Sequence, residues 1–147
     1  MYASYLQAWK FLKLILAAQN LIYAFEASLK IITEGPVSLE QRFQTHRDQS
    51  AKFKAAALAL GFKHVATDPS TAANGMTAVY VPDGIAPAAL IGALGSRNIV
   101  IAGGLHKDIK TKYIRFGHLG HSAIATDHVD QLIAGLQAAH AEVAPSK

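Results

Sequence analysis

The distribution of glycine and proline constrains the fold of this chain more than any other feature of the sequence. Residues 3–33 contain neither residue type, so nothing in this stretch interrupts a helix. The pair Gly35-Pro36 then supplies a helix stop signal. Apolar residues recur in the stretch at helical spacing, at Ile15, Ala18, Ile22, Phe25, Leu29 and Ile32. The sequence therefore predicts a long N-terminal helical segment over residues 1–35, formed of one helix or of two.

A second helix is expected after this stop signal. Ser38 is a suitable N-cap residue, and Gln41 three positions later completes a weak capping box. Gly61 fits the position just after a helix end, where a left-handed backbone favours glycine. We therefore expect a helix that begins after Ser38 and ends before Gly61.

Beyond Gly61 the sequence alternates in the manner of β-strands, with turn residues between the runs. Four strands are expected, at residues 62–66, 76–82, 98–101 and 112–117. A helix is expected between the second and third strands, at residues 86–95, with Pro87 in its first turn.

A last helix is expected after the fourth strand, capped by Thr126 or Asp127. Its apolar face carries Val129, Leu132, Ile133 and Leu136. The order of elements predicts an α+β fold, with a mostly antiparallel four-stranded sheet covered by helices. We expect this domain to span residues 36–147 and the N-terminal helical segment, residues 1–35, to serve packing or oligomerisation.

The amino-acid composition indicates which kinds of partner this chain can have. Apolar residues make up 51% of the chain and charged residues 16%, which suggests that a partner covers some apolar surface. We therefore expect a homo-oligomer or pairing with another protein. The net charge is +4, but the basic residues are scattered, so nucleic-acid binding is not expected. The chain has no cysteine, which excludes disulfides and thiolate chemistry.

The apolar run at residues 11–18 has three interpretations: the core of a signal peptide, an amphipathic mitochondrial presequence, or a helix packed on a partner. Lys13 interrupts the run, and no good cleavage site follows it. A membrane span needs about 20 apolar residues, and polar residues break up this stretch. We expect a helix packed on a partner, no membrane span, and an intracellular location, cytoplasmic or mitochondrial.

Arg115 is the main candidate for ligand binding. It follows a Gly103-Gly104 turn and a charged loop, inside a short β run. A guanidinium offers a planar pair of donors that suits a carboxylate. The alternative is a structural ion pair with Asp108, Asp127 or Glu142. The glycine pair itself is expected to permit a close approach of the backbone and not to bind phosphate.

His118 and His121 form a His-x-x-His pattern. Zinc needs three or four ligands with fixed geometry, and no third ligand has a diagnostic spacing, although His106 and His128 could approach in space. No metal site is expected. Both histidines flank Arg115 in the sequence, so we expect them as pocket liners. Ser122 lacks the sequence context of a catalytic nucleophile.

Three motifs carry a resemblance to a known family. They are Leu60-Gly61-Phe62, the run Asn74-Gly75-Met76-Thr77-Ala78-Val79-Tyr80-Val81-Pro82, and Ala102-Gly103-Gly104-Leu105 followed by Ile114-Arg115-Phe116-Gly117-His118-Leu119-Gly120. Together they resemble the C-terminal small domain of class V pyridoxal-phosphate aminotransferases of the alanine–glyoxylate and serine–pyruvate type. The resemblance runs from about residue 21 to residue 143. It implies that Arg115 binds the carboxylate of a small amino or keto acid.

The departures from that family concern the cofactor. The lysine that forms the Schiff base and the aspartate that faces the pyridine nitrogen have no counterpart in this chain. We therefore expect no pyridoxal phosphate here and no transamination by this chain alone. The main interpretation is a truncated, aminotransferase-like small domain that binds a substrate carboxylate. The alternatives are a repurposed, cofactor-free protein with a new hydrophobic pocket or dimer interface, and a dimerisation module without a small ligand.

Overall fold

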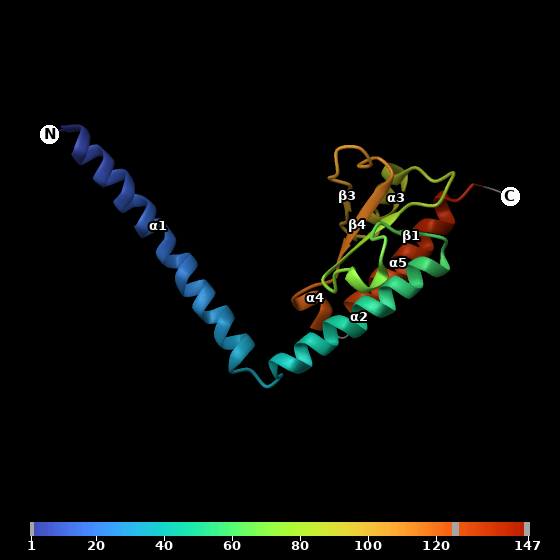
Figure 1. Ribbon diagram of the computed structural model, residues 1–147, viewed down its shortest axis with the longest axis horizontal. Helices are drawn as coiled ribbons and strands as arrows, with labels where there is room; N and C mark the ends of the chain where they lie inside the picture. Colours follow the sequence, from blue (N-terminus) through green and yellow to red (C-terminus); the bar gives the residue numbers. More distant parts are fainter. Residues whose placement is uncertain (1, 125–126, 146–147) are drawn as a thin grey trace. The chain divides into compact units, whose positions relative to one another are not determined.

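The computed structural model describes the backbone of residues 2–124 and 127–145, and the side chains of residues 18–124 and 127–145 (Figure 1). The chain divides into two compact units, residues 1–42 and 43–147. The boundary expected from the sequence, between residues 35 and 36, stays a prediction. Within the part that is described, no helix is long and apolar enough to cross a membrane.

The first unit contains one long helix, α1 (Tyr2–Thr33). The sequence left open one helix or two, and the structure has one. Every described side chain from Gln19 to Glu34 is exposed to solvent. Glu26 and Lys30 form an ion pair one turn apart, 2.8 Å between Oε1 and Nζ, a pairing that contributes a few tenths of a kcal/mol in helices, roughly 0.2–0.5.

Helix α2 (Leu39–Ala59) begins with the capping box that the sequence predicts. The Gln41 backbone N–H donates to Ser38 Oγ at 3.2 Å, and the Ser38 N–H donates to Gln41 Oε1 at 2.9 Å. At the other end Gly61 has φ +85°, the left-handed conformation expected after a helix. Both predicted ends of this helix are confirmed.

The second unit is built on a four-stranded antiparallel sheet in the order β1-β2-β4-β3. Its strands are β1 (Lys63–His64), β2 (Met76–Tyr80), β3 (Ala102–Gly103) and β4 (Tyr113–Gly117). The remaining elements are η1 (Pro69–Thr71), α3 (Pro87–Gly95), α4 (His121–Ile124) and α5 (His128–Val143). The α+β fold with a four-stranded antiparallel sheet and an N-terminal helical segment is thus confirmed.

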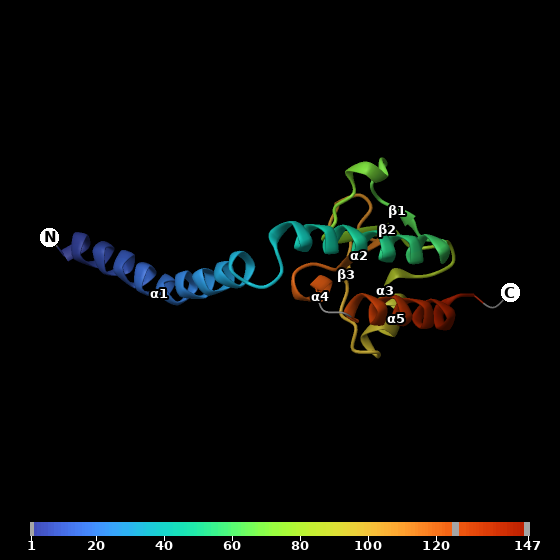
Figure 2. The same cartoon turned by 90° about the horizontal axis from the view of Figure 1, so that it is seen from below.

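Helices α2, α3 and α5 cover one face of the sheet (Figures 1 and 2). Alternation along the central strands places Val79, Ile114 and Phe116 on this face, and all three are fully buried. The helices contribute most of the other members of the core, among them Phe53, Ala57, Leu90, Leu94, Val129 and Leu136. The apolar face predicted for α5 is confirmed, because Val129 and Leu136 are buried there while Leu132 and Ile133 pack against the core.

The third strand is the main error of the sequence prediction. Residues 98–101 form no strand, and the strand β3 lies just after them at Ala102–Gly103. The end of α3 explains the difference: Ile99 N–H donates back to Leu94 O at 3.0 Å, and Asn98 adopts a left-handed φ of +60°. The residues after that turn lie outside the ladder, and Val100 is 94% exposed.

The other boundaries differ by less. The first strand is limited to Lys63–His64 where 62–66 was expected, and the second ends at Tyr80 where Pro82 was expected. Pro87 occupies the start of α3 as predicted. Asp127 is the N-cap residue of α5, but its side chain makes no capping hydrogen bond and accepts one from the Gln131 amide instead. The alternative cap, Thr126, lies outside the described residues.

Candidate functional site

Arg115 lies in the middle of β4, on the face of the sheet opposite to the helices. Its cross-strand neighbours are Ala78 on β2 and Ala102 on β3, whose side chains lie on the same face. Both neighbours are small, so they leave room above the sheet for the guanidinium. The Arg115 side chain is half-buried, which keeps part of it accessible to a ligand.

One hydrogen bond orients the Arg115 guanidinium. Its Nε donates to the carbonyl oxygen of Gly103 at 2.8 Å. Neither terminal nitrogen has a hydrogen-bond or ion-pair partner among the described residues. The planar pair of donors that would meet a carboxylate is therefore unoccupied within the described chain.

The three carboxylates considered as structural partners of Arg115 lie elsewhere. Glu142 pairs with Arg97 at 2.8 Å. Asp127 accepts a hydrogen bond from the Gln131 side chain at 2.8 Å. Asp108 forms no ion pair with Arg115 within the described residues. The structural ion pair that was the alternative for Arg115 is thus absent from the described part of the chain.

Hydrogen bonds to the Tyr113 hydroxyl hold the loop between β3 and β4 next to Arg115. Tyr113 Oη accepts hydrogen bonds from the backbone N–H groups of Leu105, at 2.8 Å, and His106, at 3.1 Å. These donors, that of His106 first, lower the pKa of Tyr113 because they stabilise its phenolate form. A Cβ on Gly104 would lie 2.6 Å from Lys110 O, so the backbone there approaches more closely than any other residue allows. The close-approach role predicted for the glycine pair is confirmed at Gly104.

His118 belongs to the other face of the sheet. Its ring is 1% exposed, lies 5.6 Å from the Phe53 ring and makes a 2.7 Å hydrogen bond between Nε2 and Thr77 Oγ1. Its Nδ1 has no hydrogen-bond partner among the described residues. His118 lines a cavity of about 230 Å³ together with Ser122 and His128, but Arg115 does not line this cavity. His118 thus lines a cavity, but on the face of the sheet opposite to Arg115, and its expected role beside a ligand of Arg115 stays a prediction.

Burial makes His118 a pH-sensitive part of the core. Burial is the largest effect and lowers the pKa of His118. The backbone carbonyls of His118 and Asn74 act in the opposite direction, and the nearby charges of Lys54 and His46 lower the pKa further. The folded state therefore holds this histidine neutral below the pH at which an unfolded histidine, with a pKa of about 6.5, takes up a proton.

We expect the free energy of unfolding to fall as the pH drops below about 6.5, because the unfolded state then binds more protons than the folded state. Urea unfolding between pH 7.5 and pH 5, at about five pH values, measures this slope. The control is His118→Gln, whose amide can still reach Thr77 but cannot take up a proton. The variant should flatten the slope, and an unchanged slope would contradict the assignment to His118.

His121 begins α4 on the exposed surface, and its ring lies 5.6 Å from that of His128. It does not line the cavity beside His118. No group of three metal-ligating side chains with suitable geometry occurs in the described part of the chain.

Pyridoxal phosphate, the cofactor of the family that the sequence resembles, needs a lysine for its Schiff base and a carboxylate for its pyridine nitrogen. Burial lowers the pKa of Lys54, as a Schiff-base lysine would require. The Lys54 Nζ, however, donates hydrogen bonds to the carbonyls of Ala72, at 3.4 Å, and Ala73, at 2.9 Å. No carboxylate forms an ion pair with it among the described residues. Lys54 therefore does not fit the role of the Schiff-base lysine.

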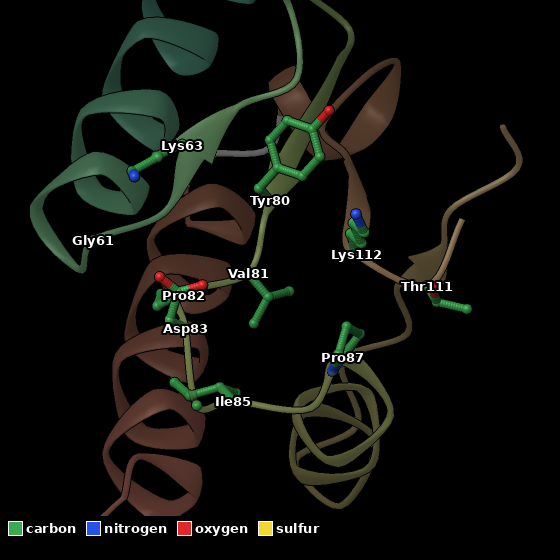
Figure 3. A pocket seen from close by; sticks show the side chains of 11 residues that line it. Gly61, Lys63, Tyr80, Val81, Pro82, Asp83, Ile85, Pro87, Thr111 and Lys112 are labelled. Carbon is green, nitrogen blue, oxygen red and sulfur yellow. The ribbon is translucent and has the colours of Figure 1, made fainter. Parts of the chain in front are cut away.

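A larger cavity, of about 640 Å³, opens at the other end of the sheet (Figure 3). Lys63 and Tyr80, which lie opposite each other on β1 and β2, line it together with Asp83, Lys112 and the start of α3 at Pro87. Its lining mixes charged and apolar side chains. Arg115 lines neither this cavity nor the one beside His118.

Known proteins with a similar sequence or structure show which family has this architecture. Over 107 residues the chain is 44% identical to alanine–glyoxylate aminotransferase 1 of Saccharomyces cerevisiae, a match that covers 71% of this chain and 26% of the relative. The crystal structure of alanine–glyoxylate aminotransferase from Nostoc sp. has a TM-score of 0.71 and 26% identity, covering 82% of this chain and 31% of that one. This chain carries a class V aminotransferase-like small domain. No family model matches the sequence.

A second crystal structure agrees with the assignment of the aminotransferase-like domain. Ureidoglycine–glyoxylate aminotransferase from Bacillus subtilis has a TM-score of 0.66 and 28% identity, covering 74% of this chain and 28% of that one. The aminotransferase-like chain thus spans about a quarter of the length of the curated relative. The family resemblance drawn from the motifs around Arg115 is confirmed.

Two residues that support the site were not foreseen from the sequence. Thr77 is 2% exposed and holds the buried ring of His118. Tyr113 fastens the loop that precedes β4 through its hydroxyl. The alternation of β2 offered a signal for Thr77, since a polar side chain at an inward position needs a partner.

Proposed function

We propose that the aminotransferase-like domain binds the carboxylate of a small amino or 2-oxo acid through Arg115. The observation that carries this proposal is the pair of unoccupied guanidinium nitrogens above two alanines, on the face of the sheet away from the helices. The names of the alanine–glyoxylate and ureidoglycine–glyoxylate relatives support it, because glyoxylate carries a carboxylate of this kind.

The role is one of binding and orientation. A carboxylate accepts two parallel hydrogen bonds from the two terminal nitrogens, and this fixes the direction of the rest of the ligand. The Gly103 carbonyl accepts the hydrogen bond of Nε, so the two terminal nitrogens remain for the ligand. Transamination itself needs a Schiff-base lysine, and the family resemblance gives this chain no counterpart of it. We infer that the domain contributes to it only when joined with the rest of an aminotransferase.

Ligand-observed NMR tests this role by measuring the binding of pyruvate, glyoxylate, alanine and serine to the full chain. We expect Arg115→Lys to weaken binding nearly as much as Arg115→Ala, because lysine keeps the charge but loses the planar fork. The loss of a charge-assisted pair costs about 1.5–3 kcal/mol, or roughly ten- to a hundredfold in affinity.

Two controls accompany this measurement. Arg97→Lys changes an arginine that already pairs with Glu142, so it should leave ligand binding unchanged. The amide of the best ligand should fail to bind, since it lacks the carboxylate. If no small acid binds, or if Arg115→Lys binds as well as the wild type, the proposed role is wrong.

The second candidate function is a repurposed, cofactor-free protein that binds its ligand elsewhere. The cavity at Lys63, Tyr80 and Lys112 supports it, because apolar and cationic side chains meet there. Binding of small ligands that does not depend on Arg115 would favour this second candidate over the first. A yellow purified protein would indicate bound pyridoxal phosphate and would contradict the cofactor-free interpretation.

The proposal extends to association with another chain. The apolar surface of the N-terminal helical segment suggests packing on a second copy of this chain or on another protein. Residues 1–35 would then act as the oligomerisation segment that the sequence predicts.

A further inference from the structure

Helix α1 presents apolar side chains to solvent along its described length. Ile22, Phe25, Leu29 and Ile32 are 62%, 64%, 41% and 38% exposed. A helix that is apolar over so much of its surface is normally buried against something. We therefore expect another surface to cover the apolar side chains of α1.

One set of apolar residues in α1 follows a regular spacing. Steps of four and three residues alternate without a break through Phe11, Ile15, Ala18, Ile22, Phe25, Leu29 and Ile32. This is the 3.5-residue repeat of a coiled coil, and it persists for three heptads. It places Ile15, Ile22 and Leu29 at a positions, and the other four residues at d positions. We call the described part of this stripe, Ile22, Phe25, Leu29 and Ile32, the α1 seam.

We propose that α1 is a self-association surface, on which α1 of a second copy of this chain packs along the α1 seam. A seam with this repeat is complementary to another seam with the same repeat, because each a or d side chain enters a gap between four side chains of the facing helix. Two copies of one chain supply matching seams automatically, and such an interface closes with two-fold symmetry.

The length of the helix is sufficient for a specific interface. At 1.5 Å per residue the 32 residues of α1 extend about 48 Å. A contact strip about 10 Å wide along this length amounts to roughly 1,000 Å² over both partners, the area from which specific interfaces begin. The inference rests on the association of residues 1–35 proposed above and names its partner. It involves none of the residues proposed to bind the carboxylate, so its failure and the failure of ligand binding can be told apart.

The helix also supplies its own control. Tyr23 and Ile31 are 67% and 65% exposed, as apolar and as accessible as Ile22 and Phe25. The heptad places them at b and c positions, outside the α1 seam. A specific coiled-coil contact depends on Ile22 and Phe25 but not on this second pair, whereas general stickiness depends equally on both pairs.

Sedimentation velocity of the full chain, from about 1 to 100 µM, tests the proposal. The wild type should sediment as a dimer at the upper end of this range. The double substitution Ile22→Gln and Phe25→Gln removes four apolar side chains from the dimer, and it should weaken association at least about 100-fold. The control with Tyr23→Gln and Ile31→Gln, which also removes one aromatic and one isoleucine, should associate like the wild type.

Two results would overturn the proposal. The first is a wild-type chain that remains monomeric at the highest concentration; if that monomer binds phosphatidylserine vesicles, α1 is assigned to a lipid surface instead. The second is an equal loss of association in both double variants, which would indicate unspecific apolar contact. Far-UV circular dichroism on each variant ensures that the second unit keeps its fold in every comparison.

Discussion

Replacing Phe53 by alanine is expected to lower the free energy of unfolding by about 3–5 kcal/mol, since the loss of a buried phenyl ring leaves a cavity as well as removing apolar contacts. Phe53 is fully buried in α2, where its ring packs 4.8 Å from Phe116 and 5.6 Å from His118. The substitution therefore removes the contact that joins α2 to β4 on the core face of the sheet. Urea unfolding followed by circular dichroism at neutral pH measures the change.

The control for Phe53 lies on the same helix. Leu58 is 48% exposed, so Leu58→Ala should change the free energy of unfolding by no more than about 0.5 kcal/mol. Equal losses in both variants would mean that the packing of α2 on the sheet differs from the one described.

Replacing Gly104 by alanine is expected to cost about 3 kcal/mol, near the upper end of the range for overpacking. An added Cβ would lie 2.5 Å from Tyr113 Cε1 and 2.6 Å from Lys110 O. The Lys110 backbone and the hydrogen-bonded Tyr113 ring cannot move aside as the end of a flexible side chain can. The loop that Tyr113 Oη holds should shift, and the environment of Arg115 should change with it.

Gly92→Ala is the matched control for this substitution. Nothing lies within 4 Å of a Cβ at Gly92, and this glycine is in the interior of α3. Alanine is the better helix former there by roughly 0.5–1 kcal/mol, so the variant should be slightly more stable than the wild type. Thermal unfolding of both variants checks the pair, and a Gly104→Ala protein as stable as the wild type would contradict the close approach described.

Local chemistry made much of the fold predictable from the sequence. Ser38, Gln41 and Gly61 act through hydrogen bonds and backbone angles within a few residues, so the ends of α2 could be read directly. Residues 98–101 alternate too little to fix a strand by themselves. Whether such a run joins a ladder depends on the turn before it, and the left-handed backbone at Asn98 set that turn.

The candidate site was predictable in its chemistry but not in its surroundings. Arg115 could be singled out because a lone guanidinium in a β run needs a partner. Its neighbours Ala78 and Ala102 depend on strand register, which is determined by pairing over long sequence separations. For the same reason the sequence grouped His118 with Arg115, whereas His118 follows the end of β4 and its buried ring lies on the core side, bonded to Thr77.

The hydrogen bond between Arg115 Nε and the Gly103 carbonyl couples the orientation of the guanidinium to the motion of the edge strand β3. β3 is two residues long and pairs with the rest of the sheet only through β4. Edge strands of this length open locally far more often than the sheet centre does. Each opening would release Nε and let the guanidinium turn. If Arg115 binds a carboxylate as proposed, the local stability of β3 would then set how often the guanidinium is oriented for binding. A ligand that holds the fork would in turn slow the hydrogen exchange of the amides that pair β3 with β4.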